Sequence, residues 1–207
     1  MESALIEHAW IDLNAAPLRA SRVIDFTVPT DAKWAGVVEL APGETFSLED
    51  GDRYDFYLLR GSVNVEGRAL EIGDFLIHQD SAVMQAADDG ARLLAYREAG
   101  DESPHQFARL AKGRTWRNGI NPQMQVAPLD GGQHRISLVA WEPGAQTQRH
   151  THPAGEEMFV LSGELSDADE RYPTGTWLRL HPGSTHAPFA RVPTVILLRH
   201  GHLAPVQ

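Results

Sequence analysis

Residues 144–163 of the chain read GAQTQRHTHPAGEEMFVLSG, and this stretch decides how the C-terminal half is interpreted. It holds two histidines one residue apart, His150 and His152, and then Glu156. Side chains at positions i and i+2 of a β-strand point to the same side, so the two imidazoles can face one point. Pro153-Ala154-Gly155 is a turn sequence that can bring Glu156, at the start of the next strand, alongside them.

A fourth residue of the ligand type follows a second turn. His186 comes after Pro182-Gly183, and can approach the same point from another strand. A single histidine on an apolar strand is usually structural, but three imidazoles and one carboxylate suit a divalent transition metal. The sequence therefore predicts one metal site in the C-terminal half, built from His150, His152, Glu156 and His186.

The chain also repeats itself at a shift of 102 residues. The run FYLLRG at 56–61 falls on MFVLSG at 158–163, and GDFL at 73–76 falls on GTWL at 175–178. LLAYR at 93–97 falls on VILLR at 195–199 in the same register. Three matches in one register, each an apolar run or a turn glycine, predict a duplicated structure.

Each half consists of short runs rich in β-branched, aromatic and leucine residues, such as 136–141, 157–161, 177–180 and 194–199. Turn residues separate the runs at intervals of about 8–14 residues, which is typical of an all-β sandwich or barrel. Short helices near the N-terminus, within 2–10, remain an option. The polar segment 99–114 is the best candidate for the connection between the halves.

The pattern G-x5-H-x-H-x3-E-x6-G at 144–163, followed by a motif ending in Gly183-Ser-Thr-His186, resembles the two metal-binding motifs of the cupin superfamily. Residues 156–188 further resemble the cupins related to ChrR, which occur in a zinc-dependent anti-sigma factor and as free-standing proteins. The resemblance implies an all-β chain of two tandem cupin (jelly-roll) barrels, and it implies that His150, His152, Glu156 and His186 are the metal ligands. Two positions depart from the family pattern. His181 replaces a common proline, although Pro182-Gly183-Ser184 keeps the turn. Ala190 replaces a common asparagine, which affects the turn and not the metal.

We expect two domains, a cupin-like repeat at 1–105 and a ChrR-like cupin at 106–207. The N-terminal repeat is predicted to lack the metal site, because the four ligand positions fall on Leu48, Asp50, Tyr54 and Met84. A shift of 101 gives Glu49 and Gly51 for the first two. Leucine and methionine at such positions indicate a packed interior instead.

The composition excludes several classes of function. The chain has 207 residues and no cysteine, so disulfides, cysteine-zinc sites and thiol catalysis are ruled out. Its net charge is -10 with only 18 Lys and Arg, which argues against direct binding to nucleic acid. No apolar run is long enough for a membrane span, and the N-terminus lacks a signal pattern, so we expect a cytoplasmic protein.

Several side chains near the motif receive plainer interpretations. Strand alternation sends Glu157 to the face opposite Glu156, where a solvated or interface carboxylate is expected, while Met158 and Val160 should line the barrel beside the metal. Arg179 is interpreted as an exposed or paired charge. A turn or supporting role is expected for His181, and solvent-exposed positions are expected for His200 and His202.

Three functional hypotheses remain open. The first is a small-molecule-binding metal cupin, and within it a dioxygenase-type enzyme that polarises a chelating oxygen substrate; Zn or Fe(II) is favoured, with Mn or Ni as options. The second is a ChrR-like, zinc-binding stress-sensing module that acts through a protein partner. The third is a storage or structural protein. A homodimer is expected from the resemblance, whereas sigma-factor binding is not, because the helical domain of the anti-sigma factor is missing.

Overall fold

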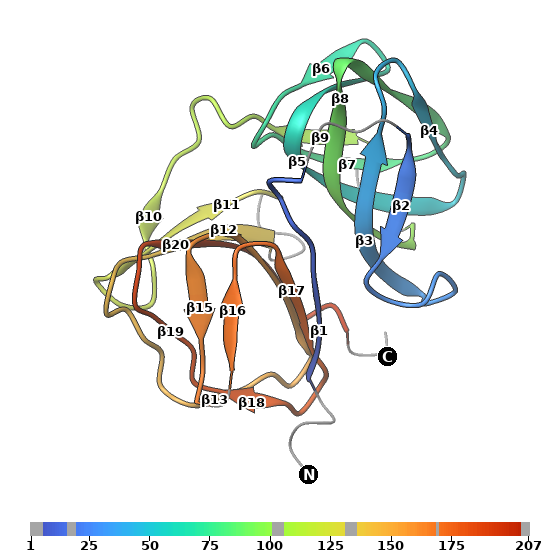
Figure 1. The fold of residues 1–207 in the computed structure, drawn as a ribbon. Coiled ribbons are helices and arrows are strands. Elements are labelled where there is room, and N and C mark those ends of the chain that lie inside the picture. The colour runs from blue at the N-terminus through green and yellow to red at the C-terminus, as the bar shows by residue number, and fades with distance from the viewer. Residues whose placement is uncertain (1–5, 16–19, 101–105, 131–135, 169, 204–207) are drawn as a thin grey trace. The chain divides into compact units, whose positions relative to one another are not determined.

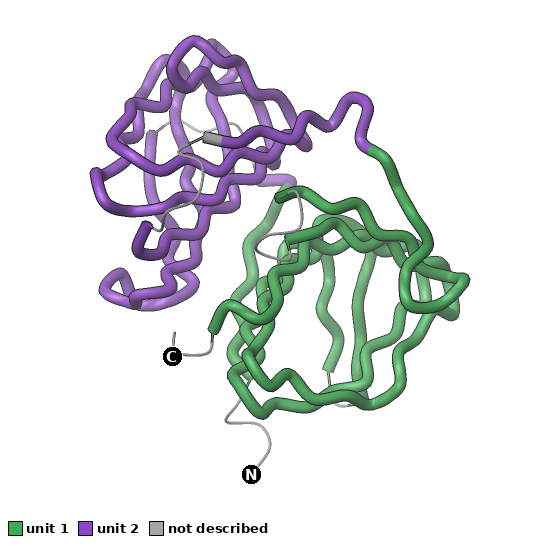
Figure 2. Tube along the Cα trace, turned by 180° about the vertical axis from the view of Figure 1, so that it is seen from behind, with its two compact units in different colours: residues 1–13, 115–207 green, residues 14–114 purple. Residues whose placement is uncertain are grey.

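The structure is a computed structural model that describes residues 6–15, 20–100, 106–130, 136–168 and 170–203. These residues form strands and loops and contain no helix, so the predicted all-β class is confirmed. They consequently contain no helix with the length and apolar character needed to cross a membrane. The chain divides into two compact units, residues 14–114 and residues 1–13 with 115–207 (Figure 2).

The N-terminal unit is built around two long strands that bend and pair with several neighbours. Its sheet has the order β2-β3-β8-β5-β7-β9, with β4 paired to β8 and β6 paired to β5 (Figure 1). The strands are β2 (Arg22–Asp25), β3 (Lys33–Leu40), β4 (Thr45–Leu48), β5 (Asp52–Val65), β6 (Arg68–Leu70), β7 (Phe75–Gln79), β8 (Ala82–Ala99) and β9 (Gln106–Arg109).

The C-terminal unit contains a seven-stranded sheet of order β1-β17-β14-β20-β12-β11-β10, a three-stranded sheet β16-β15-β19 and a two-stranded ladder β13-β18. Its strands are β1 (Ile6–Trp10), β10 (Arg117–Asn118), β11 (Met124–Pro128), β12 (Ile136–Trp141), β13 (His150–Thr151), β14 (Glu156–Ser162), β15 (Glu164–Ser166), β16 (Arg171–Pro173), β17 (Thr176–Leu180), β18 (Thr185–His186), β19 (Phe189–Ala190) and β20 (Thr194–His200).

The register of the strands confirms the 102-residue repeat. The order β2-β3-β8-β5-β7-β9 corresponds to β11-β12-β20-β14-β17-β1. Tyr57 pairs with Phe75 in the N-terminal unit, and Phe159 pairs with Trp177 in the C-terminal unit, each 102 positions later. The apolar runs that revealed the repeat are therefore the paired central strands of two equivalent sheets.

A glycine at the same point of each repeat allows its strand to bend. Gly61 and Gly163 have positive φ values of 70° and 80°. A Cβ at Gly61 would lie 1.9 Å from the carbonyl oxygen of Gly90, and one at Gly163 would lie 2.2 Å from that of Pro193. Only glycine fits these close backbone approaches, which accompany the irregular register between β14 and β20.

The predicted division at 105/106 differs from the observed one at both ends of the N-terminal repeat. β1 precedes that repeat in sequence but pairs with β17 of the C-terminal unit, with Ile6 opposite Leu180. β9 precedes the C-terminal repeat but pairs with β7 of the N-terminal unit, with Ala108 opposite Leu76. The two leading strands thus occupy equivalent edges of opposite units, and the possible helix near the N-terminus is a strand over the described residues 6–10.

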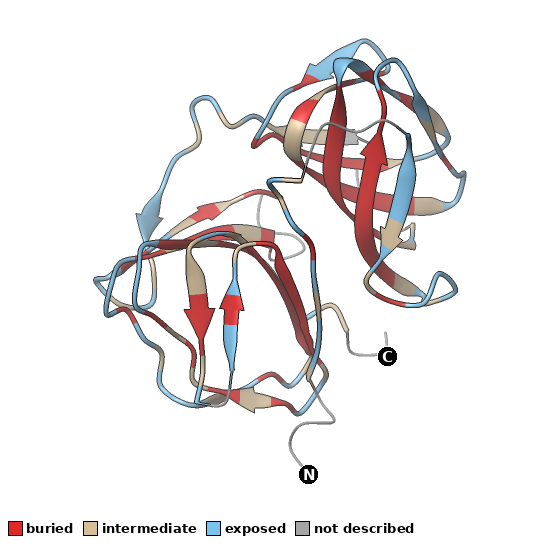
Figure 3. Ribbon diagram, in the orientation of Figure 1, coloured by how far each residue is buried: buried red, intermediate tan, exposed pale blue. Residues whose placement is uncertain are grey.

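Each unit has its own apolar core, and the central strands are its most buried parts (Figure 3). In the N-terminal unit Leu48, Tyr54 and Met84 belong to this core and are at most 3 % exposed. These residues stand at three of the four positions that correspond to the metal ligands. The packed interior predicted for that part of the repeat is therefore confirmed.

Candidate metal centre

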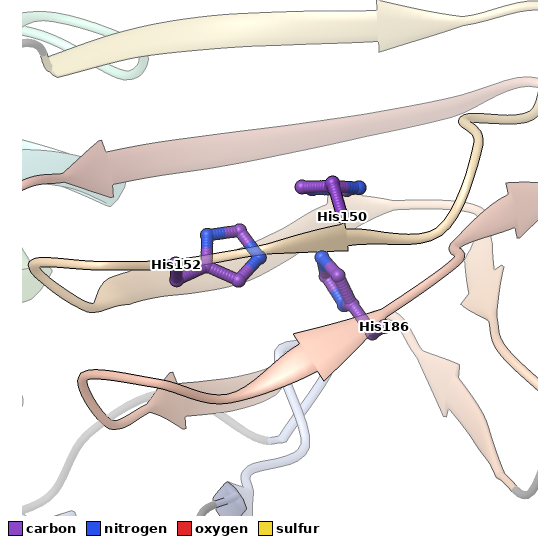
Figure 4. A group of neighbouring side chains, drawn as sticks. All are labelled: His150, His152 and His186. Atoms are coloured by element: carbon purple, nitrogen blue, oxygen red, sulfur yellow. The ribbon is translucent and has the colours of Figure 1, made fainter.

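The candidate site lies where a short two-stranded ladder faces the start of β14. β13 and β18 pair antiparallel, with His150 opposite His186 and Thr151 opposite Thr185. His152 follows directly after β13, in the turn that leads to Glu156. Figure 4 shows the three histidines on these two segments, with their rings gathered together. The predicted alternation and turn geometry thus bring the imidazoles to one place.

The three imidazoles lie at nearly equal separations. Ring centroids are 4.7 Å apart for His150 and His152, 4.8 Å for His150 and His186, and 4.8 Å for His152 and His186. One nitrogen from each ring can be chosen so that all three lie within 4.8 Å of one another. Such spacing is close to what three nitrogen ligands that share one ion at about 2.0–2.1 Å require.

Glu156 adds a carboxylate beside two of these rings. Its Oε2 lies 3.4 Å from His152 Nδ1, and its Oε1 lies 3.8 Å from His186 Nε2. The residue is 8 % exposed, and Met158 and Val160 on the same face of β14 belong to the apolar core. The prediction that these two residues point into the interior is confirmed, and their position beside a metal stays a prediction.

The hydrogen bonds of the cluster leave ring nitrogens available to an ion. His150 Nδ1 lies 2.8 Å from the carbonyl oxygen of Gln148, which favours the tautomer that donates there and keeps a lone pair on Nε2. His152 Nε2 is buried and has no hydrogen-bond partner. A buried polar atom without a partner is costly unless something else binds it, so the residues present fit a metal ion.

Burial controls the charges of this cluster. It lowers the pKa of His152 to about 4, aided by the neighbouring His150, and the pKa of His186 to about 3, aided by His152 and His150. It also raises the pKa of Glu156 to about 8. Both buried imidazoles are therefore neutral at pH 7, which is the form that binds metals.

Glu157 corrects one prediction from the sequence. Its side chain does point to the face of β14 opposite that of Glu156, but it is fully buried instead of solvated. Oε1 accepts hydrogen bonds from Arg179 Nε at 3.0 Å, and Oε2 lies 3.2 Å from Arg199 Nη1 and 2.6 Å from His202 Nε2. Arg179 was interpreted as either an exposed or a paired charge, and it is paired. The solvent-exposed position predicted for His202 is wrong.

His181 lies outside the cluster. Its Nε2 is 2.7 Å from Glu7 Oε1 on β1, so it links the turn before β18 to the N-terminal strand. This agrees with the supporting role expected for it.

A cavity of about 400 Å³ adjoins the histidine cluster. His186, Thr185 and Arg149 are among its lining residues, and β1 contributes Ile6 and His8. The sequence analysis missed the part played by β1. The alternation Ile6-Glu-His8-Ala-Trp10 was the available signal, but nothing in the sequence tells which sheet edge this strand joins.

Comparison with known proteins finds a family model and solved structures that resemble the chain. Residues 108–204 match the model of the ChrR Cupin-like domain. A "putative dioxygenase" from Nostoc punctiforme has a TM-score of 0.72 and 15% identity, covering 97% of this chain and 85% of its own. The protein Ylba from E. coli has a TM-score of 0.69 and 12% identity, covering 97% and 93%.

Bacillus subtilis oxalate decarboxylase, a protein with Mn(II) centres, has a TM-score of 0.63 and 16% identity, covering 97% of this chain and 78% of its own. No curated protein sequence matches the chain. At these identities the solved structures establish the fold alone.

Proposed function

Starting from the fold that the chain shares with solved cupins and from the match of residues 108–204 to the ChrR Cupin-like domain, we propose a metal-dependent cupin that binds a small oxygen-containing molecule in its C-terminal unit. The observation that carries the proposal is the convergence of His150, His152 and His186, with a buried nitrogen of His152 left without a partner. Together with Glu156, these residues would hold one divalent transition metal per chain.

The ligand set determines which chemistry the site can support. Three neutral imidazoles and one carboxylate leave a divalent ion with a residual charge of about +1, which favours an anionic oxygen ligand. A bound ion would supply Lewis-acid catalysis or redox chemistry there. The chain itself holds the imidazoles in position through the β13-β18 ladder and lines the interior with Met158 and Val160.

Within this proposal we favour a dioxygenase-type enzyme that acts on a chelating oxygen substrate. The fold shared with the Nostoc punctiforme protein and with the Mn-containing oxalate decarboxylase supports it, as does the cavity next to His186, which offers room for a small molecule. Fe(II)-loaded protein under air should consume oxygen with a 1,3-diketone, a catechol or a 2-oxo acid. Failure with all three classes would count against the enzyme.

The metal site itself is tested by metal analysis of the full chain purified without chelators. We expect about one equivalent of a divalent ion per chain and its loss in His152→Ala, because one of the proposed ligands is removed. His181→Ala is the matched control and should keep its metal, since His181 contacts Glu7 outside the cluster. Equal metal content in the two variants would contradict the proposal.

A second candidate is a zinc-binding regulatory module, favoured by the match to the ChrR Cupin-like domain. Four protein ligands complete a tetrahedral zinc ion and leave no position for a substrate, whereas an octahedral ion keeps two positions open. X-ray absorption spectroscopy of the protein as purified distinguishes the two. Four-coordinate zinc that is unchanged by added oxygen ligands would favour the regulatory module over the enzyme.

A further inference from the structure

The N-terminal strand presents one of its faces to a groove beside the metal cluster. Ile6 and His8 line the cavity of about 400 Å³ that also contains His186. His8 and Trp10 line a second cavity of about 370 Å³. These residues are two apart along β1, so their side chains share one face, whereas Glu7 on the other face contacts His181.

The two cavities share part of their lining. Both are lined by His8 of β1 and by Glu170 and Tyr172. We call the two cavities together the β1 groove; His186 lines the first and Trp10 lines the second. The β1 groove therefore includes one of the proposed metal ligands and three residues of the N-terminal strand.

The two cavities of the β1 groove differ in chemistry. Near His186 lies Arg149, whose Nη2 donates a hydrogen bond of 2.8 Å to Thr185 Oγ1. A planar guanidinium next to a cation site suits a carboxylate. The second cavity is lined by Trp10, Tyr172 and Pro173, which offer flat apolar surfaces.

The acidic residues of the groove are engaged by its own side chains. Tyr172 donates its hydroxyl to Asp167 Oδ2 at 2.9 Å, and Glu170 Oε2 lies 3.5 Å from His8 Nδ1. These contacts hold both carboxylates in place, and the attraction for an anionic ligand comes from Arg149 and from the metal.

The tryptophan is exposed but held in place. Trp10 is 58% exposed, and its Nε1 donates a hydrogen bond of 3.0 Å to the carbonyl oxygen of Thr174 in the turn after β16. A large aromatic ring left open to solvent and fixed by its polar atom provides a ready surface for a ligand to stack on.

We propose that the β1 groove is the substrate subsite and that it selects a carboxylic acid with a planar apolar body. The carboxylate end lies near Arg149 and the metal cluster, and the apolar body lies between Tyr172 and Trp10. This inference rests on the proposed function, since the head group needs the metal. It makes β1 part of the binding site and Trp10 a specificity-determining residue.

The experiment uses full-length protein loaded with Co(II), whose visible absorption reports on ligands entering the metal site. Pyruvate and phenylpyruvate are titrated separately, because they share a 2-oxo acid head and differ by an aromatic ring. We expect phenylpyruvate to bind roughly tenfold more tightly, as an added aromatic contact would give. Trp10→Ala should abolish this preference without changing pyruvate binding, whereas Trp10→Phe, which keeps an aromatic ring, should retain most of it.

Trp116→Ala is the matched control, because Trp116 is also exposed in the C-terminal unit but does not line the groove. A preference lost in Trp10→Ala and kept in Trp116→Ala supports the inference. The inference is overturned if the protein binds Co(II) normally but shows no preference for phenylpyruvate, or if both alanine variants lose that preference equally. Either result leaves the proposed function standing. Failure of the wild-type chain to bind Co(II) overturns both.

Discussion

Replacing Glu157 by glutamine should destabilise the C-terminal unit more than any change at an exposed charge. The carboxylate is 0 % exposed and is shared by Arg179 and Arg199, which are themselves only 3 % exposed. Glutamine has nearly the same shape but no charge, so both buried guanidinium groups lose the carboxylate between them. Removing one partner of a buried ion pair typically costs about 3–5 kcal/mol.

The lowered pKa of Glu157 gives a similar value for the stability that its ion pairs contribute. Burial alone would raise this pKa, but the hydrogen bond and charge of His202 and the charges of Arg199 and Arg179 lower it from 4.5 to about 2. A shift of this size corresponds to about 3 kcal/mol of stability. Because the folded-state pKa is the lower one, this stability is present above pH 4.5 and is lost as the pH falls toward 2.

Urea and thermal unfolding at pH 7 measure the effect. A loss of about 3 kcal/mol should lower the melting temperature of a unit this size by more than about 10 °C. Glu164→Gln is the matched control, since Glu164 pairs with Arg171, whose side chain is 69 % exposed, and such pairs contribute less than about 1 kcal/mol. If Glu157→Gln melts within error of Glu164→Gln, the reasoning about the buried network is refuted.

Three further outcomes are expected. Gly163→Ala should cost about 2–3 kcal/mol, because its Cβ would meet backbone 2.2 Å away, whereas Gly183→Ala, with a similar φ and open space, should cost about 1 kcal/mol in urea unfolding. Zinc at 100 times its dissociation constant should stabilise the C-terminal unit by about 2.7 kcal/mol in a thermal melt, and His186→Ala should not respond. Met84→Ala should destabilise the N-terminal unit by about 2–5 kcal/mol and leave the metal content unchanged, as unfolding and metal analysis would show.

The part of the site that the sequence predicted best is the part set by local geometry. His150, His152 and Glu156 lie within seven residues, so strand alternation and one turn are enough to bring them together. The repeat was equally accessible, because its apolar runs recur at one shift and occupy paired central strands in both units. Assignment of these residues as metal ligands stays a prediction until metal analysis is done, as do the homodimer and the cytoplasmic location.

The errors arose where tertiary neighbours decide the outcome. Alternation correctly placed Glu157 on the face opposite Glu156, but a single strand does not reveal that Arg179 and Arg199 from the two flanking strands cover that face. Chain order likewise suggested that β1 belongs to the N-terminal half, whereas it pairs with β17. Sheet edges accept any strand with a compatible register, so sequence proximity is a weak guide to such pairing.

The two adjacent glutamates of β14 show what a cation would change at the site. Both are buried carboxylates on one strand, and they differ in their partners. Glu157 has His202 and two guanidinium groups beside it, and these lower its pKa to about 2, whereas Glu156 has neutral imidazoles beside it, and burial raises its pKa to about 8. A divalent ion held by His150, His152 and His186 would give Glu156 the positive charge that Arg179 and Arg199 give Glu157, which explains how a carboxylate can occupy this otherwise apolar interior.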